Sequence, residues 1–155
     1  MAISTITGAS TGSTGTVITT GSPQSGGVIQ VVSAYTNSGY TSTTSTSYVA
    51  TTLSVSITPK FSTSKFLVFI NGGIYQGTGG TGYYSIFRNG GNVLNNQIEN
   101  QVLNTWLTTS GHIYDTPATA STLTYAVYMK ASSNTTYWGA DSPLTNFITV
   151  MEISA

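Results

Sequence analysis

From residue 28 to the end of the chain, hydrophobic and polar residues alternate with a period of two. This is the repeat of a β-strand that buries one of its faces. Within residues 48–58, for example, Leu53, Val55 and Ile57 alternate with serine and threonine. No stretch has the 3.6-residue period of an amphipathic helix. The pattern therefore predicts an all-β protein.

Turn signals separate the alternating stretches into about eight or nine strands. Pro59 and Pro117 end strands, and Asn89-Gly90 between two such stretches is a strong hairpin signal. Eight strands in two sheets would form a jelly roll, so we predict an antiparallel, jelly-roll-like β-sandwich. The predicted strands cover residues 28–35, 48–58, 65–75, 83–88, 93–98, one or two strands within 102–114, 123–130 and 147–154, with a turn leading into Tyr137 and Trp138 before the last.

The stretch 65–75 differs from the others because it is almost continuously apolar. Such a sequence is typical of a central strand that is buried on both faces. Gly72 and Gly73 near its end predict a bulge or a bend.

Charged residues make up only 5% of the chain, against roughly 25% in ordinary soluble domains. Low charge favours association between copies, which a protein held in a fixed assembly tolerates. Four basic and four acidic residues leave no surplus positive charge for nucleic acid. There is no cysteine and no apolar run of about 18 residues. We therefore expect no disulfide, no membrane span and, from the polar start of the chain, no secretory leader.

Residues 1–27 are rich in Gly, Ser and Thr and cannot bury enough apolar surface to fold alone. We predict an extended N-terminal arm over residues 1–27, followed by a sandwich domain over residues 28–155. Contacts with a neighbouring subunit would have to hold the arm in place. Its expected anchors are its apolar residues Ile3, Ile6, Val17 and Ile18.

The sequence offers little for catalysis. His112 is the only histidine, and it could form a Ser-His-Asp arrangement only with Asp115 or Asp141. A glycosidase pair would need two of the four carboxylates, Glu99, Asp115, Asp141 and Glu152, to converge across a sugar, and with so few of them a role in solubility or in an ion pair is favoured. One histidine without cysteine makes a transition-metal site improbable, and no cluster of oxygen ligands suggests calcium. We therefore expect a non-enzymatic protein without cofactor or metal.

Two further motifs favour structural interpretations. The glycine-rich stretch 77–82 leads into a strand and lacks a following lysine, so a flexible hairpin loop is favoured over phosphate binding. Asn134-Thr135-Thr136 matches a glycosylation sequon, which a threonine-rich chain contains by chance. Aromatic residues near loops and strand ends favour subunit contacts, with stacking on sugar rings as the alternative. These candidates are Tyr35, Tyr40, Tyr83, Tyr84, Tyr137 and Trp138.

The order of several short segments resembles a β-domain of tailed-phage virion proteins. The segments are GGVIQVV, SVSITP, SKFLVFINGG, YSIFRNG, TYAVYMKASSNTTYWG and FITVMEIS, between residues 26 and 155. Such domains occur at the C-termini of tail-fibre-like proteins and as small head decoration proteins. The resemblance implies a jelly-roll-like fold, a homotrimer and no catalytic residues.

The same resemblance implies a virion protein that is assembled in the host cytoplasm. Only the short arm precedes the β-domain in this sequence, whereas tail-fibre members carry a long shaft. We therefore expect a capsid decoration (cement) protein that binds the major capsid protein or other virion proteins. The alternative is a tail-fibre or tail-tip module that recognises a host surface glycan.

Overall fold

The structure is a computed structural model of the 155-residue chain. It describes residues 25–37, 39–94, 97–101, 104–139 and 145–155. These residues form β-strands joined by turns and loops, and they include no helix that could cross a membrane. The strands are β1 (Val28–Thr36), β2 (Thr41–Thr43), β3 (Val49–Ile57), β4 (Lys65–Gln76), β5 (Gly82–Arg88), β6 (Gly91–Asn92), β7 (Ile98–Asn100), β8 (Leu107–Asp115), β9 (Leu123–Ala131), β10 (Thr136–Trp138) and β11 (Asn146–Ile153).

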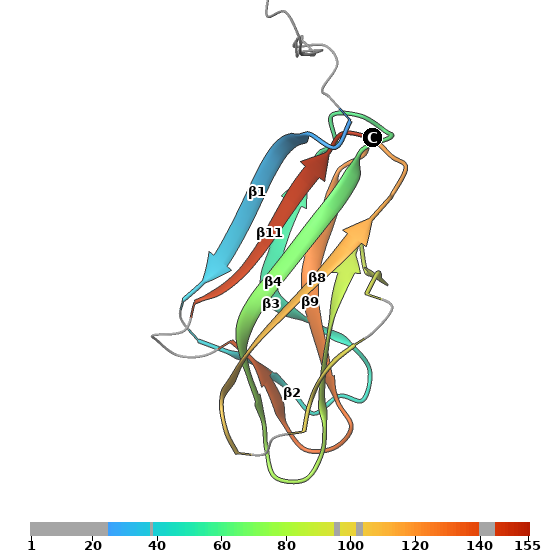
Figure 1. Cartoon of the computed structure of the whole chain (residues 1–155). Coiled ribbons are helices and arrows are strands. Elements are labelled where there is room, and N and C mark those ends of the chain that lie inside the picture. Colours follow the sequence, from blue (N-terminus) through green and yellow to red (C-terminus); the bar gives the residue numbers. More distant parts are fainter. Residues whose placement is uncertain (1–24, 38, 95–96, 102–103, 140–144) are drawn as a thin grey trace, which may run out of the picture.

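The strands form two antiparallel sheets that pack face to face (Figure 1). In the first, called sheet A, the order is β1-β11-β4-β8, and β10 and β2 continue beside the last residues of β4. In the second, called sheet B, the order is β3-β9-β5, and both β6 and β7 pair with β5. The last strand of the chain thus lies between β1 and β4. This arrangement confirms the predicted antiparallel, jelly-roll-like β-sandwich.

The core lies between the sheets and consists of the inward-facing residues of both. Alternation along each strand sends one set of side chains into this core and the other set to an outer face. Fully buried examples are Phe66, Val68, Ile70, Tyr84, Ile86, Tyr125, Val127, Met129, Trp138, Ile148 and Val150.

Of the predicted bulge or bend at Gly72 and Gly73, the bulge is wrong, because β4 pairs with β8 in continuous register through both residues. Gly72 is needed for packing instead. A Cβ atom there would lie 2.6 Å from Cζ2 of Trp138 and 2.7 Å from Oδ1 of Asn146. Glycine allows the indole ring to lie directly against the backbone of β4.

The predicted hairpin is confirmed at its turn, where Asn89 and Gly90 have positive φ angles of 49° and 83°. The strand predicted over residues 93–98 does not form at Val93, Leu94 and Gln97, whereas Ile98 begins β7; residues 95 and 96 lie outside the described part of the chain. β6 ends at Asn92, and the amides of Val93 and Leu94 both donate to the carbonyl oxygen of Ile86. This irregular pairing ends the ladder, and β7 resumes it at the other end of β5.

Candidate assembly surface

The outer faces of the two sheets differ in chemistry. Sheet B presents small polar side chains along β3 and the start of β9, and aromatic rings along β5 and the rest of β9, where Phe87 stacks on Tyr128 with ring centroids 3.9 Å apart. The hydroxyls of Ser56 and Thr124 lie 2.8 Å apart, as do those of Thr58 and Thr122. These hydroxyls satisfy one another, and none of the large hydrophobic side chains that are highly exposed among the described residues lies in a strand of sheet B.

Sheet A presents an apolar row that crosses all four of its long strands. Val31 pairs with Met151, Met151 with Leu67, and Leu67 with Tyr114. The two ends of the row are exposed, with 51% of Val31 and 58% of Tyr114 accessible to solvent. Directly opposed apolar side chains on one face form a continuous hydrophobic stripe.

The next rows of sheet A combine aromatic and polar side chains. Tyr35 pairs with Phe147, and Phe69 pairs with His112, whose ring centroid lies 6.1 Å from that of Phe69. A shallow hollow of about 500 Å³ lies on this face, and Phe69, His112, Phe147 and Met151 are among the residues that line it. The hollow extends the apolar stripe towards the middle of the sheet.

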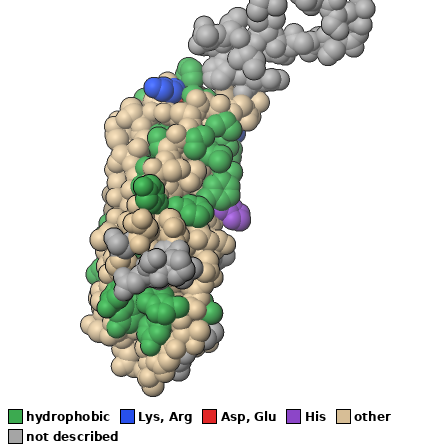
Figure 2. All heavy atoms as spheres, turned by 90° about the vertical axis from the view of Figure 1, so that its left-hand side faces the viewer, with side chains coloured by type: hydrophobic (Ala, Val, Ile, Leu, Met, Phe, Trp, Pro, Cys, Tyr) green, Lys and Arg blue, Asp and Glu red, His purple; other side chains and the backbone are tan. Residues whose placement is uncertain are grey.

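Four aromatic rings cluster where β10 and β2 continue sheet A. This aromatic cluster consists of Tyr40, Tyr75, Trp106 and Tyr137. Tyr137 lies edge-on to Tyr40 and Tyr75, with ring centroids 5.1 and 5.3 Å apart, and Tyr75 lies 5.2 Å from Trp106. Tyr40 and Trp106 remain 52% and 38% exposed. Seen from the side of β1, hydrophobic side chains gather in an upper and a lower group (Figure 2).

Charges are scarce on the outer face of sheet A. Its register places only Lys65 and His112 there among the described ionisable residues other than tyrosine. The described carboxylates lie elsewhere. Glu152 is buried, where it accepts hydrogen bonds from the Lys60 amide at 2.7 Å and from Gln30 Nε2 at 2.5 Å. Glu99 pairs with Tyr83 in sheet B.

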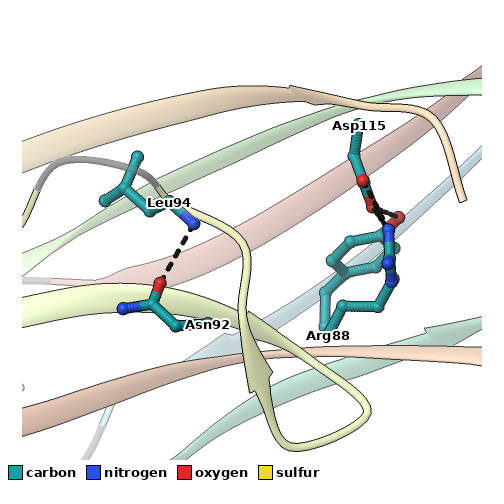
Figure 3. Close-up of polar contacts among 5 residues, drawn as sticks. Arg88, Asn92, Leu94 and Asp115 are labelled. Atoms are coloured by element: carbon teal, nitrogen blue, oxygen red, sulfur yellow. Dashed lines mark hydrogen bonds and ion pairs between the residues drawn. The ribbon is translucent and has the colours of Figure 1, made fainter.

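The remaining described carboxylate, Asp115, lies between the sheets (Figure 3). It accepts a hydrogen bond from Nη1 of Arg88 at 2.5 Å and from the hydroxyl of Tyr125 at 2.7 Å. The hydrogen bond to Asp115 raises the pKa of Arg88. Burial, and then the hydrogen bond to Asp115, raises the pKa of Tyr125. The pair joins β5 of sheet B to β8 of sheet A.

The structure separates the residues considered for catalysis. His112 points to the outer face of β8, whereas Asp115 points inward to Arg88. A Ser-His-Asp arrangement through Asp115 therefore does not form, and Asp141 lies outside the described residues. Within the described part of the chain, no group of three His, Cys, Asp or Glu side chains could hold a metal ion.

The glycine-rich loop between β4 and β5 is tied to the loop between β9 and β10. Ser133 Oγ donates to the carbonyl oxygen of Gly79, and the Thr81 amide donates to Ser132 Oγ, each at 2.8 Å. The side-chain amide of Asn134 donates to the carbonyl oxygens of Thr78 and Gly79. These bonds fix the loop, which leads into a strand.

The aromatic residues selected from the sequence fall into three environments. Tyr35, Tyr40 and Tyr137 lie on the outer face of sheet A. Tyr83 lies on sheet B beneath Lys130, whose Nζ is 5.0 Å from its ring centroid.

Tyr84 and Trp138 are core residues, only 0% and 1% exposed, so their interpretation as loop or interface contacts is corrected. Both point inward because they alternate with outward-facing neighbours along their strands. Sheet A also exposes residues that were not predicted from the sequence, namely Val31, Tyr75, Trp106, Tyr114 and Phe147. The outward phase of each strand's alternation would have identified those that lie within strands.

The proposed arm anchors Ile3, Ile6, Val17 and Ile18 lie outside the described residues. Comparisons with known proteins add no relative, because no protein-family model and no curated protein matches the chain. The surface of sheet A is therefore the feature on which a functional proposal must rest.

Proposed function

We propose that this chain is a structural protein of a phage virion that acts by assembling with other chains. Its specific role is that of a capsid decoration (cement) protein, which binds the head shell as a homotrimer and stabilises it. The partners are further copies of itself and the major capsid protein or other virion proteins. The mechanism is mechanical, and no catalytic residue, cofactor or metal is assigned.

The observation that carries this proposal is the apolar outer face of sheet A on a sandwich with few charges. Large exposed apolar patches on soluble proteins mark interaction sites. The row from Val31 to Tyr114 crosses the whole sheet, and the described residues bring no carboxylate to that face. Assembly would remove this surface from water. The sequence resemblance supports the assignment to the head.

The arm is the proposed attachment device. Residues 1–27 would lie across the capsid surface or add to the sheet of a neighbour, with Ile3, Ile6, Val17 and Ile18 as apolar anchors. Ordering an extended segment costs about 1–2 kcal/mol per residue in backbone entropy. Contacts outside its own domain would have to offset that cost.

The second candidate is a tail-fibre or tail-tip module that recognises a host surface glycan. The aromatic cluster favours it, because the partly exposed rings of Tyr40 and Trp106 offer faces on which a sugar could stack. In this case the trimer would be located at the tail.

Imaging of intact particles distinguishes the two candidates. The chain would be labelled with a specific antibody and its copy number per particle determined by quantitative mass spectrometry. A decoration protein should cover the head in a number comparable to that of the major capsid protein. Label confined to the tail, in a few copies per particle, would support the tail module and contradict the head assignment.

A further inference from the structure

We propose that other copies of this chain cover the outer face of sheet A, and that the aromatic cluster anchors this contact. The inference rests on the self-assembly part of the proposed function and specifies its surface. It is independent of whether the assembly is located at the head or at the tail.

Strand β4 has the sequence of a strand that is buried on both faces. In the single chain only its inner face is buried. Leu67, Phe69 and Tyr75 on the outer face remain partly exposed. A partner on sheet A would complete the burial that the sequence of this strand indicates.

The exposed apolar surface of sheet A is large. Taking about 200 Å² for one aromatic side chain, the exposed parts of Tyr35, Tyr40, Trp106, Tyr114 and Phe147 amount to roughly 500 Å². Val31 and the partly exposed side chains of β4 and β11 add to it. The total approaches roughly 800 Å², the area that one partner buries in a standard pairwise interface, and in a ring of three copies it would be shared between two neighbours.

The outer face of sheet A also carries little charge. Lys65 is the one permanently charged side chain that the described residues bring to this face. A strongly acidic or basic partner would therefore find few counter-charges. A second copy of the same face carries apolar side chains as well and, among the described residues, no carboxylate, so neither surface would bury an unpaired carboxylate.

The position of the exposed side chains indicates how many neighbours the face has. The exposed apolar side chains lie at both edges of sheet A, with Val31 and Tyr35 on β1 and Tyr114 on β8. In a closed ring of three copies, each face meets two neighbours, one on either side. Apolar residues at both edges fit such an arrangement.

The aromatic cluster fits the role of anchor. Interfaces are enriched in tyrosine and tryptophan, which combine large apolar area with a polar group. The hydroxyl of Tyr75 donates to Asn104 Oδ1 at 3.2 Å, and Thr78 Oγ1 donates to the same atom at 3.3 Å. The polar tip of Tyr75 is thus satisfied within the chain, while the rings of Tyr40 and Trp106 present uncovered apolar surface.

A charge-insertion experiment on the full chain tests the surface. Val31→Asp places a carboxylate on the exposed edge strand of sheet A. Its matched control, Ala50→Asp, places one at an exposed position on β3, the edge strand of sheet B. Analytical ultracentrifugation should show that Val31→Asp raises the dissociation constant of the oligomer about 100-fold or more, as expected for an unpaired buried charge. Ala50→Asp should leave it nearly unchanged.

A wild-type monomer at all concentrations would overturn the inference, and so would equal behaviour of the two variants. The assignment to a virion would survive either result, because the copy number on particles tests it separately. Circular dichroism would detect a loss of folding in Val31→Asp. In that case, tryptophan fluorescence of the wild-type chain would test whether sheet A is covered.

The two tryptophans provide this second measurement. Trp138 is buried inside the chain, whereas Trp106 is 38% exposed. The protein would be measured at low concentration, where the oligomer dissociates, and at high concentration, where it assembles. On assembly, Trp106 should become protected from acrylamide quenching and its emission should shift to shorter wavelength. Trp106→Phe identifies its share of the signal. Persistent quenching of Trp106 in the oligomer, or protection only after a neutral oligosaccharide is added, would overturn the inference in favour of a free glycan site.

Discussion

At the scale of single residues, Tyr84 illustrates how the core accommodates a polar group. Its hydroxyl lies 2.6 Å from Thr136 Oγ1 and donates to the carbonyl oxygen of Tyr137 at 3.0 Å. We predict that Tyr84→Phe lowers the free energy of unfolding by about 1–3 kcal/mol, because buried partners lose their hydrogen bonds. Urea unfolding measures this loss. Tyr35→Phe, at a 70% exposed position, is the control and should change stability little.

The same residue makes stability depend on alkaline pH. Burial raises the pKa of Tyr84 to about 12 from an ordinary value of 10.0. The folded protein therefore keeps this proton at a pH where the unfolded chain releases it. Stability from this group is fully present below about pH 10 and falls by up to about 1.4 kcal/mol per pH unit as the pH rises towards 12.

Tyr84→Phe should reduce this slope, as measured by urea unfolding across the alkaline range. Burial also raises the pKa of Tyr125, so part of the pH dependence should remain in the variant. Identical slopes for wild type and variant between about pH 10 and 12 would show that Tyr84 does not titrate with folding.

At the scale of elements, Gly72 marks the place where β4 changes partners from β11 to β10. We predict that Gly72→Ala destabilises the fold by about 1–3 kcal/mol, because the added methyl group would overlap Trp138 and force the core to shift. Thermal unfolding monitored by circular dichroism measures the effect. Gly91→Ala, where a Cβ would make only an ordinary contact with Arg88, is the control. Equal stability of the two variants would contradict the packing role.

The strands could be predicted from the sequence wherever alternation was long. The stretches around Leu53, Val127 and Val150 fall in strands whose bounds agree within one or two residues. Short elements were missed, because β2 comprises only three residues, Thr41–Thr43, and has no periodicity of its own. The break after Asn92 was missed because it depends on two amides sharing the carbonyl of Ile86, a tertiary detail.

The sequence could predict that the candidate site is an assembly surface, but not which residues form it. An apolar, weakly charged chain indicates self-assembly, but which face assembles depends on strand order. Val31 and Tyr114 are far apart in the sequence. They form the two ends of one row only because β11 and β4 lie between their strands. Tyr84 shows the converse, since aromatic character alone does not distinguish an inward position from an outward one.

At the scale of the whole molecule, the two sheets have different tasks. The outer face of sheet B combines paired hydroxyls with aromatic rings that pack against one another and against Lys130, and it leaves no large hydrophobic side chain of its described strands highly exposed. Sheet A carries apolar side chains on its inner and outer faces, so it suits the middle of an assembly. The Arg88–Asp115 pair links the two layers across the core. A sandwich with this asymmetry would present sheet B outward once sheet A is covered.

The arm gives the last prediction at this scale. Deleting residues 1–21 should leave the sandwich folded and trimeric, because its ladder begins at Gly26, whose amide donates to the carbonyl oxygen of Ser154 at 2.9 Å. The midpoint of thermal unfolding should therefore match that of the full chain. The same deletion should weaken attachment, because the proposed anchors Ile3, Ile6, Val17 and Ile18 are removed.

Occupancy on particles that lack the wild-type protein measures that attachment. A chain in which these four residues are replaced by serine is the matched control, since it keeps the length of the arm and removes only its apolar side chains. Both variants should bind less than the full chain if apolar contacts hold the arm. Full occupancy by the truncated protein would show that the sandwich itself attaches to the particle, and would transfer the attachment role from the arm to the surfaces of the two sheets.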